Sequence, residues 1–503
     1  MQADDFHIYF AQHCPATKKH TGRRAYGRGV FVMEAHYMKL QWNGKTPRDI
    51  LRISSPGEFF NWLPQSFIDA PALFVLAAFC LFPVPVAVHA LFAKSFDLMV
   101  IDSMEILDYF VFPCTAVVTV LVYVFTLGKL WRAKLSPLKE IERHPVFVLF
   151  LFLLAWMSVG FVFVHGRTLE ASYGFALNHE SIYLQMEYFL GFFALGVAMG
   201  NPRWKLWFLR GVTAVSVFLV PCAFYFWHHI TATPIYYDWR PSVACIWTNI
   251  NYYGYVLTIC VSLSAALFAG ASSWRWRVFY GVALAANSVV LCYNDTLGAW
   301  IGAFCGCVFV VVVYWLRDGK CNRWALVALG LFVLSMLAAG IASGKLSYNF
   351  GRLFRDVGLV LTEPDSEAAQ HAGSNRWILW VRSMKLIRRY PLFGIGFEGV
   401  ITKNVLTFTT NARPHNEYMQ YALFYGVPAA ILYTLGCLGV YIRGWRLRAR
   451  LDNATLAALC AAFGYLCGAF FGITVYNTAA YLFIMLGLGY VRASDALPGR
   501  KRS

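Results

Sequence analysis

Long apolar stretches alternate with short polar segments along most of the chain. Many of these stretches approach the roughly 20 residues that a helix needs to cross about 30 Å of hydrocarbon. Backbone groups in lipid must bond to one another, and the alternation typical of a membrane barrel is absent, so the stretches predict helices. We therefore predict an all-α polytopic integral membrane protein with about twelve spans. The spans lie near residues 71–93, 109–128, 146–165, 183–200, 207–228, 252–270, 278–293, 297–316, 324–343, 417–442, 454–473 and 478–491.

The positions of Lys and Arg predict the orientation of the spans. Basic residues gather in short segments that each follow an even number of crossings, near residues 129–143, 203–205, 275–277, 317–323 and 443–450. Short loops rich in Lys and Arg remain in the cytoplasm, so these segments and both termini are expected there. The chain then divides into a basic cytoplasmic tail (1–70), nine spans (71–343), a long extracytoplasmic loop (344–416), three spans (417–492) and a cytoplasmic tail (493–503).

The connection between the seventh and eighth spans is very short. Only Asn294, Asp295 and Thr296 separate them. This connection is either a tight turn on the outer side or the break of a helix pair near the middle of the membrane. We favour the tight turn.

Composition agrees with a membrane protein. The chain is 59% hydrophobic and 14% charged, whereas soluble domains carry about 25% charged residues. Its net charge of +17 would suit nucleic acid, but the basic clusters between apolar stretches are better read as cytoplasmic loops, and we predict no nucleic-acid partner. Most cysteines lie in apolar stretches, and Cys305 and Cys307 have the wrong spacing for a zinc knuckle. We therefore predict no metal, disulfide framework or cofactor.

The long loop carries more basic residues than an outer segment usually does, although long loops escape the orientation rule. Its middle, residues 375–390, reads as an amphipathic helix that Ser374 or Asn375 caps and Pro391 ends. Such a helix either lies on anionic lipid headgroups or forms an electropositive basin that gathers a phosphate-bearing substrate. The two readings are compatible, because a lipid-linked substrate arrives through the headgroup layer.

Two segments of this loop carry a family resemblance. From Ser374 the chain reads SNRWILWVRSMKLIRRYPLFGIGFEG, and RPHNEYMQYALFYG follows after a short interval. Together they resemble the region shared by O-antigen ligases and O-antigen polymerases. The matching positions are Arg376, Pro391, Gly394, Gly396, His415, Asn416 and Gly426. A looser match is Arg240 with the run that follows it at residues 249–254.

The chain also departs from this family pattern. It has Thr296-Leu297-Gly298 where family members frequently have Ser-Arg-Gly, and Ala429 where a glycine is expected. The first departure removes one basic residue, and the second alters packing only. The first seventy residues have no counterpart in the family.

The resemblance implies a membrane glycosyltransferase of the bacterial inner membrane that acts on its outer side. Such an enzyme moves a glycan from an undecaprenyl-pyrophosphate carrier to an acceptor hydroxyl on a lipid, a protein or another glycan. The leaving group already carries two phosphates, so its departure needs positive charge and fixed donors more than a strong acid. The outer segments show no paired carboxylates typical of a hydrolase and no Asp-x-Asp typical of a sugar-nucleotide metal site. We expect metal-independent, inverting transfer.

The resemblance assigns roles to particular residues. His415 is expected to be the general base for the acceptor hydroxyl, since histidine titrates near neutral pH. Asn416 orients the imidazole, donates to the pyrophosphate, or only caps a helix. Arginines hold the pyrophosphate, because arginine stays ionised and binds phosphate in a bidentate fork. They are Arg240 and Arg376, with Arg352, Arg355 and Arg413 as weaker candidates.

Other readings of the same residues stay open. Gly394 and Gly396 are expected to let the backbone turn tightly and to offer amides to phosphate. Arg413 pairs with either the substrate or Glu417, while His415 is alternatively a surface histidine and Arg376 or Arg240 an interfacial arginine that reaches toward water. A transporter or flippase of lipid-linked oligosaccharide is the main alternative function, and a scaffold without turnover is another. The sequence does not separate ligase from polymerase.

Overall fold

The computed structural model describes residues 53–93, 102, 104–133, 144–165, 181–229, 243–247, 249–396, 413–473 and 475–491. The chain falls into two compact units, Met1–Pro64 and Gln65–Ser503. The described part of the first unit holds the short helix α2 (Pro56–Trp62), which Ser55 caps by accepting a hydrogen bond from the Glu58 amide at 3.3 Å. The second unit holds all the predicted site residues that the structure describes.

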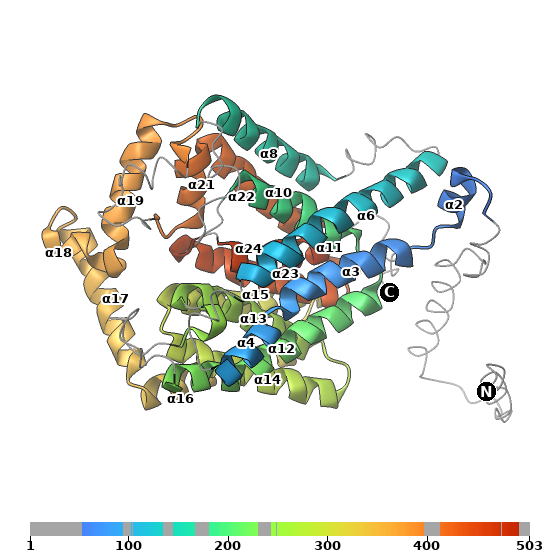
Figure 1. The fold of residues 1–503 in the computed structure, drawn as a ribbon. Helices are drawn as coiled ribbons and strands as arrows, with labels where there is room; N and C mark the ends of the chain where they lie inside the picture. Colours follow the sequence, from blue (N-terminus) through green and yellow to red (C-terminus); the bar gives the residue numbers. More distant parts are fainter. Residues whose placement is uncertain are drawn as a thin grey trace, which may run out of the picture. The chain divides into compact units, whose positions relative to one another are not determined.

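Helices make up all the regular secondary structure in the described part of the second unit (Figure 1). They include π-helical segments (η2, η3) and short 3₁₀ segments (η4, η5, η6). In chain order they are α3 (Ser66–Leu81), α4 (Pro83–Ala93), η2 (Leu107–Val111), α6 (Phe112–Arg132), α8 (Pro145–Phe163), α10 (Ile182–Met186), η3 (Glu187–Phe193), α11 (Ala194–Ala198), α12 (Pro202–His229), η4 (Cys245–Trp247), α13 (Ile250–Gly270), α14 (Trp274–Asn294), α15 (Leu297–Asp318), α16 (Arg323–Ala342), α17 (Lys345–Thr362), α18 (Glu367–Gln370), α19 (Ala372–Arg389), α21 (Glu417–Tyr425), α22 (Val427–Arg446), η5 (Arg448–Arg450), α23 (Asn453–Gly468), η6 (Ala469–Phe471) and α24 (Tyr476–Gly489).

Within the described residues, 10 helical stretches are long and apolar enough to cross a membrane. The predicted all-α polytopic membrane protein is therefore confirmed. The ten are Ser66–Ala93, Met104–Arg132, Pro145–Phe163, Pro202–His229, Ile250–Gly270, Trp274–Asn294, Leu297–Asp318, Arg323–Ala342, Val427–Arg446 and Asn453–Phe471. The remaining two predicted spans also form helices, but these are shorter: Ile182–Ala198 and α24, which has 14 residues.

The predicted span 417–442 is not one helix, and the expectation of a continuous span was wrong. It consists of α21 and α22, which meet at Gly426 with a φ of 93°. A β-carbon at this glycine would lie 1.8 Å from the carbonyl oxygen of Leu392, so only glycine fits. Pro428 then stands in the first turn of α22, where its missing N–H costs nothing.

The short connection between α14 and α15 is the tight turn that we favoured. Asp295 closes α14 in the left-handed conformation with a φ of 66°, and α15 begins at Leu297. The Asn294 side chain donates hydrogen bonds to the carbonyl oxygens of Val243 and Ile250, at 2.7 and 2.8 Å. The turn is therefore fixed against the first residue of α13.

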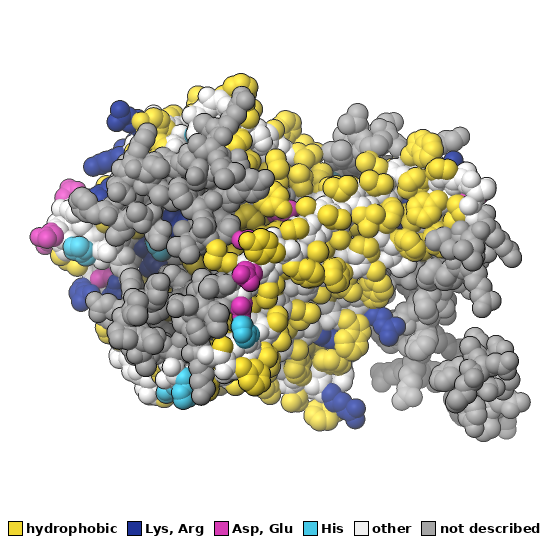
Figure 2. All heavy atoms as spheres, viewed as in Figure 1, with side chains coloured by type: hydrophobic (Ala, Val, Ile, Leu, Met, Phe, Trp, Pro, Cys, Tyr) yellow, Lys and Arg dark blue, Asp and Glu magenta, His cyan; other side chains and the backbone are white. Residues whose placement is uncertain are grey.

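Helices α13, α15 and α23 pack against one another inside the bundle, next to α24, whose residues are all buried. Small residues let α15 and α23 approach closely, since a β-carbon on Gly302 would lie 2.6 Å from the carbonyl oxygen of Gly464. Close approach through small residues is typical of helix packing in lipid. At the outside of the bundle, hydrophobic side chains cover α3 and α6 (Figure 2), and Val117, Val120 and Val124 of α6 are exposed. This outer surface suits contact with lipid.

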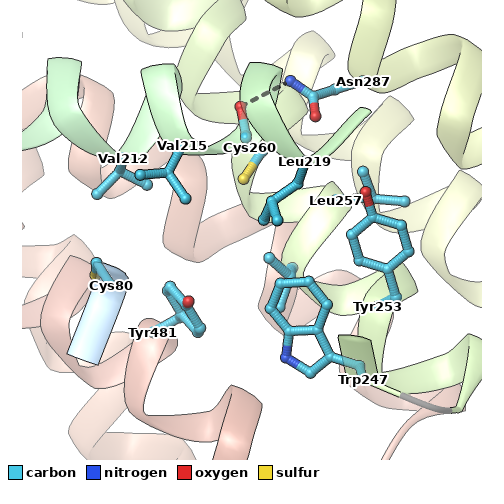
Figure 3. A pocket seen from close by; sticks show the side chains of 12 residues that line it. Cys80, Val212, Val215, Leu219, Trp247, Tyr253, Leu257, Cys260, Asn287 and Tyr481 are labelled. Atoms are coloured by element: carbon cyan, nitrogen blue, oxygen red, sulfur yellow. Dashed lines mark hydrogen bonds between the residues drawn. The ribbon is translucent and has the colours of Figure 1, made fainter. Parts of the chain in front are cut away.

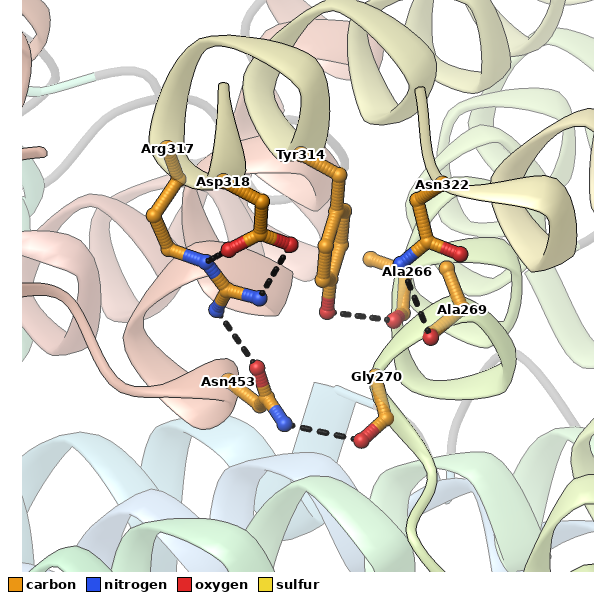
Figure 4. Close-up of polar contacts among 8 residues, drawn as sticks. All are labelled: Ala266, Ala269, Gly270, Tyr314, Arg317, Asp318, Asn322 and Asn453. Atoms are coloured by element: carbon orange, nitrogen blue, oxygen red, sulfur yellow. Dashed lines mark hydrogen bonds and ion pairs between the residues drawn. The ribbon is translucent and has the colours of Figure 1, made fainter. Parts of the chain in front are cut away.

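Contacts at the two ends of the core helices agree with alternate crossing. At one end, Arg317 donates to Asn453 at 2.6 Å, and Asn453 donates to the carbonyl oxygen of Gly270 at 2.8 Å (Figure 4). This network joins the ends of α13 and α15 to the start of α23. The opposite end holds the start of α13, the α14–α15 turn and the start of α17. Figure 1 shows α17, α18 and α19 together at that opposite end.

Candidate active site

A strained turn comes directly before the regular part of α19. Gly373, Ser374 and Asn375 all have left-handed backbone, with φ values of 62°, 60° and 69°. The Gly373 amide donates to the Asp356 carboxylate at 2.9 Å, and Arg352 donates to the Ser374 hydroxyl at 2.5 Å. Two residues of α17 thus hold the turn. Ser374 and Asn375 belong to this turn and make no capping hydrogen bond to the helix, so their expected capping role was wrong.

Arg376 opens the regular helix immediately after that turn. Its guanidinium donates to the carbonyl oxygen of Gly373 at 3.2 Å and to the side-chain oxygen of Asn251 at 3.4 Å. Its Nε atom is buried and has no hydrogen-bond partner among the residues that the structure describes. Asn251 belongs to the run at 249–254 that carried the looser family resemblance. The two matching regions therefore meet at this arginine.

His415 lies just before α21, in a backbone conformation with a φ of 50°. The indole of Trp380 on α19 donates to the carbonyl oxygen of Pro414 at 2.8 Å, which ties this segment to the helix of Arg376. The Nδ1 atom of His415 is buried, and within the described ranges it also has no hydrogen-bond partner. The Nδ1 atom is thus shielded from solvent, but no described side chain forms a hydrogen bond with it.

The charges around His415 are positive. Burial, followed by the nearby guanidinium groups of Arg376 and Arg413, lowers the pKa of His415 to about 3. The imidazole is therefore neutral at physiological pH. Arg413 is itself buried, with 3% of its surface exposed. The structure thus brings together three of the predicted site residues: Arg376, Arg413 and His415.

Asn416 and Glu417 have structural partners in this arrangement. The side-chain oxygen of Asn416 accepts from the amide of Met419 at 3.0 Å, so Asn416 caps α21. Glu417 is fully buried, and its carboxylate accepts from the hydroxyl of Tyr433 at 2.5 Å. Of the three expected roles of Asn416, the helix cap is the one with a contact in the structure.

Residues 391–396 pack their backbone against the break between α21 and α22. The Ile395 amide donates to the carbonyl oxygen of Leu423 at 2.9 Å. Gly394 has a φ of 67°, and its amide donates to the Tyr390 carbonyl at 3.1 Å. That amide is therefore engaged in the turn, and the expectation that Gly394 offers it to phosphate was wrong. Gly396 is likewise left-handed, with a φ of 71°.

The remaining predicted arginines divide into three cases. Arg352 lies close enough to Arg376 for its charge to lower the pKa of that guanidinium, after burial as the main cause. Its own guanidinium contacts Ser374 and Asp356. The side chain of Arg355 is 68% exposed and pairs with Asp356 at 3.4 Å. Arg240 lies outside the described residues.

Three residues that position the site were not predicted from the sequence: Asn251, Asp356 and Trp380. Asn251 belongs to the run at 249–254 that resembles the family. This resemblance could have indicated Asn251 as a site residue, but no specific role followed from the sequence. Asp356 and Trp380 act through contacts with Gly373 and Pro414. Neither contact has a signature in local spacing.

A separate pocket lies inside the bundle, among α12, α13, α14 and α24 (Figure 3). Its lining is mostly apolar and aromatic, with Trp247, Tyr253 and Tyr481 among the larger side chains. The main polar contact there is the hydrogen bond from Asn287 to Ser216 at 2.9 Å. Of the predicted site residues that the structure describes, none lines this pocket, and its apolar walls do not suit a sugar chain. We therefore place the candidate site at Arg376 and His415.

Part of the chain matches a known protein family. Residues 281–434 match the sequence model of a family described as O-antigen ligase. The matched stretch contains Arg376, Arg413 and His415. A comparison with curated proteins gave no match.

The family implies a glycosyltransferase-like enzyme, a ligase or a polymerase, that uses lipid-linked glycan substrates. Together with the apolar helices, it indicates a membrane protein of the bacterial envelope. The resemblance drawn from the sequence is thus confirmed. Over residues 281–434, this chain is similar to the family described as O-antigen ligase.

Proposed function

We propose that this protein transfers a glycan from an undecaprenyl-pyrophosphate carrier to an acceptor hydroxyl, with Arg376 binding the pyrophosphate and His415 acting as the base. One observation carries the proposal. Arg376 and His415 each keep a buried polar atom without a hydrogen-bond partner among the described residues, and the charge of Arg376 lowers the pKa of His415. Buried polar atoms are nearly always paired, so such a pair of atoms is typical of a site that binds a polar ligand.

Positive charge is the main contribution to leaving-group departure. The Nε atom of the half-buried Arg376 is shielded from water, and the buried Arg413 also lies near His415. A diphosphate that leaves the anomeric carbon gains negative charge, and buried arginines stabilise that charge more than exposed ones do. This chemistry needs no metal ion. Asn251 fixes one nitrogen of Arg376 and leaves Nε for the substrate.

His415 is neutral before the donor binds, as a base must be. Its low pKa also makes it a weak base in the free protein, because Arg376 and Arg413 oppose protonation. A bound pyrophosphate would offset those positive charges, and the pKa of His415 would rise. The base would thus become effective once the donor is bound, which limits proton removal in its absence.

The proposed reaction is a single displacement. The acceptor hydroxyl gives its proton to His415, and its oxygen forms a bond to the anomeric carbon. The bond from that carbon to the pyrophosphate oxygen breaks, and the electron pair leaves with the pyrophosphate beside Arg376. Attack opposite the leaving group inverts the anomeric configuration.

We also propose that this site faces the outside of the cytoplasmic membrane and that both termini lie in the cytoplasm. The support is the distribution of charge between the two ends of the core helices. The end that contains the Arg317–Asn453 network carries the short basic connections, which include Arg275, Arg277, Lys320 and Arg323. Short basic connections mark the cytoplasmic side, so the end that holds His415 faces outward.

The test is reconstitution of the purified protein in vesicles with an undecaprenyl-pyrophosphate-linked oligosaccharide and a candidate acceptor. The expected result is a new glycosidic bond of inverted configuration, formed in the presence of a metal chelator. Products that grow by repeat units indicate a polymerase, and transfer to a second acceptor indicates a ligase. Movement of the lipid-linked sugar across the membrane without a new bond would overturn the proposal in favour of a transporter.

A further inference from the structure

Helix α17 is amphipathic, but its polar face lies against the protein and its apolar face is exposed. Its polar residues Lys345, Asn349, Arg352 and Asp356 recur at helical spacing, and they turn toward the protein. Lys345 pairs with Asp295 at 3.1 Å, and Asn349 donates to the same carboxylate at 2.5 Å. Further along, Arg352 and Asp356 hold the turn before Arg376.

The opposite face of α17 is apolar, and its side chains are exposed among the residues that the structure describes. Phe350, Phe354, Val357 and Leu361 repeat at the same spacing and are all exposed, with Phe354 at 72% and Leu361 at 77%. In water, an amphipathic helix on a protein surface would have the reverse orientation, because apolar surface is favourable only when it is removed from water. An uncovered apolar stripe of this kind marks contact with another apolar phase or partner.

The apolar stripe continues a surface that already suits lipid. Helix α16 is among the membrane-crossing stretches, and its Leu334 and Ile341 are 66% and 73% exposed. The chain turns at Gly344, and Leu346 of α17 packs back on α16, where a β-carbon at Gly340 would lie 2.9 Å from that of Leu346. Helix α17 therefore starts directly at the end of this membrane-crossing stretch.

We propose that α17 is an interfacial helix whose Phe350, Phe354, Val357 and Leu361 face is immersed in the lipid of the membrane that the bundle spans. Lipid satisfies both faces at once: acyl chains cover the apolar stripe, while the polar face stays sealed against the protein. The helix lies at the level of the headgroups, and the exposed Arg355 reaches their phosphates.

This position has a consequence for the site, and that consequence rests on the proposed function. The polar face of α17 holds Gly373 and Ser374, and the next contact in the chain fixes Arg376. A helix anchored in the headgroup layer would therefore set the depth of Arg376 at the level where a lipid-linked pyrophosphate lies. Arg352 and Asp356 act as positioning residues in this arrangement.

The test measures the surroundings of α17 directly in the full-length protein. Single cysteines replace Phe354, Leu361 and, as the matched control on a different face, Arg355, in a cysteine-free background. Each is labelled with a nitroxide in vesicles of phosphatidylethanolamine and phosphatidylglycerol without substrate. We expect labels at 354 and 361 to collide mainly with lipid-dissolved oxygen, and the label at 355 to collide mainly with a water-soluble nickel complex.

Two outcomes would overturn the proposal. Labels at 354 and 361 that collide mainly with the nickel complex would show that water covers the stripe, and labels shielded from both reagents would show that protein covers it. If removal of the native cysteines impairs folding, a benzophenone side chain at position 354 of the otherwise unchanged protein should crosslink to lipid, and its absence from lipid adducts would contradict the proposal. No substrate is present in either measurement, so failure here leaves the transferase proposal standing, and the reverse also holds.

Discussion

Arg376 on α19 donates a hydrogen bond to Asn251 on α13, with 3.4 Å between the guanidinium nitrogen and the amide oxygen. This contact joins the segment between α16 and α21 to the most buried of the membrane-crossing helices. Asn251 follows the start of α13 by one residue, so it stands at the end of the bundle that also holds His415. The arginine is therefore fixed to the rigid core as well as to its own turn.

Removal of the Arg376 guanidinium should weaken donor use. Arg376→Ala is expected to lower kcat/KM for the lipid-linked donor by about 10- to 100-fold, since one hydrogen bond to a charged group contributes about 1.5–3 kcal/mol. Arg376→Lys should restore only part of the loss, because lysine lacks the bidentate fork. Steady-state kinetics with varied donor measures the effect.

The control for this comparison is Arg388→Ala. Arg388 lies on the same helix and is exposed near its end, outside the proposed site. Equal losses in the Arg376 and Arg388 variants would indicate that general positive charge, rather than a specific contact, drives donor binding.

The pH dependence of the reaction should differ between free and donor-bound protein. His415 acts as a base only when neutral, so activity is present above its pKa and is lost as the pH falls through that value. In the free protein this pKa is about 3, so kcat/KM should show no loss from His415 between pH 8 and about 5. The acidic limb of the pH profile of kcat reports the donor-bound state. It should lie at higher pH than the acidic limb of kcat/KM.

Arg413→Gln provides the second arm of the pH experiment. Because the Arg413 guanidinium helps to lower the pKa of His415, its removal should shift the acidic limb of kcat/KM upward. Acidic limbs that coincide for kcat and kcat/KM, and that do not move in the variant, would contradict the assigned role of His415.

Asp356 should affect donor binding by holding the turn at Gly373, and not by contacting the substrate. Asp356→Ala removes the acceptor for the Gly373 amide, and we expect a higher KM for the donor with a smaller change in kcat. Asp356→Asn keeps an acceptor oxygen and should recover most of the affinity. If the alanine and asparagine variants lose donor affinity equally, the carboxylate charge matters more than the hydrogen bond.

The sequence predicted the spans well because the length of an apolar stretch is local information. Family resemblance singled out Arg376 and His415, while Arg413 was only a weaker candidate. The prediction from sequence missed α17, although Phe350, Phe354 and Leu361 have helical spacing, because residues 344–416 were read as a loop around one central helix. The contact of Arg376 with Asn251 spans 125 positions of sequence, and no local pattern reveals it.

The break at Gly426 had a visible signal that the apolar pattern concealed. A glycine followed two positions later by Pro428 is typical of the end of one helix and the start of another. The apolar residues on both sides favoured one span instead. The sequence did not reveal that the carbonyl oxygen of Leu392 packs against Gly426 at this break.

Gly426→Ala should therefore destabilise the protein. The added methyl group would overlap the backbone at Leu392, and the φ of 93° disfavours alanine by a further 1–3 kcal/mol or so. We expect a clearly lower Tm in detergent, measured by thermal aggregation and size-exclusion chromatography. Gly330→Ala is the control, since nothing lies within 4 Å of its β-carbon position and it sits in α16; it should keep the original Tm or raise it.

The most direct test of the central claim is a single-turnover assay of His415→Ala with saturating lipid-linked donor, run beside a measurement of donor binding. Loss of the general base should slow formation of the glycosidic bond by about 10²- to 10⁴-fold, while donor affinity stays close to that of the unchanged protein. Bond formation at an undiminished rate in this variant, with the donor bound, would contradict the account.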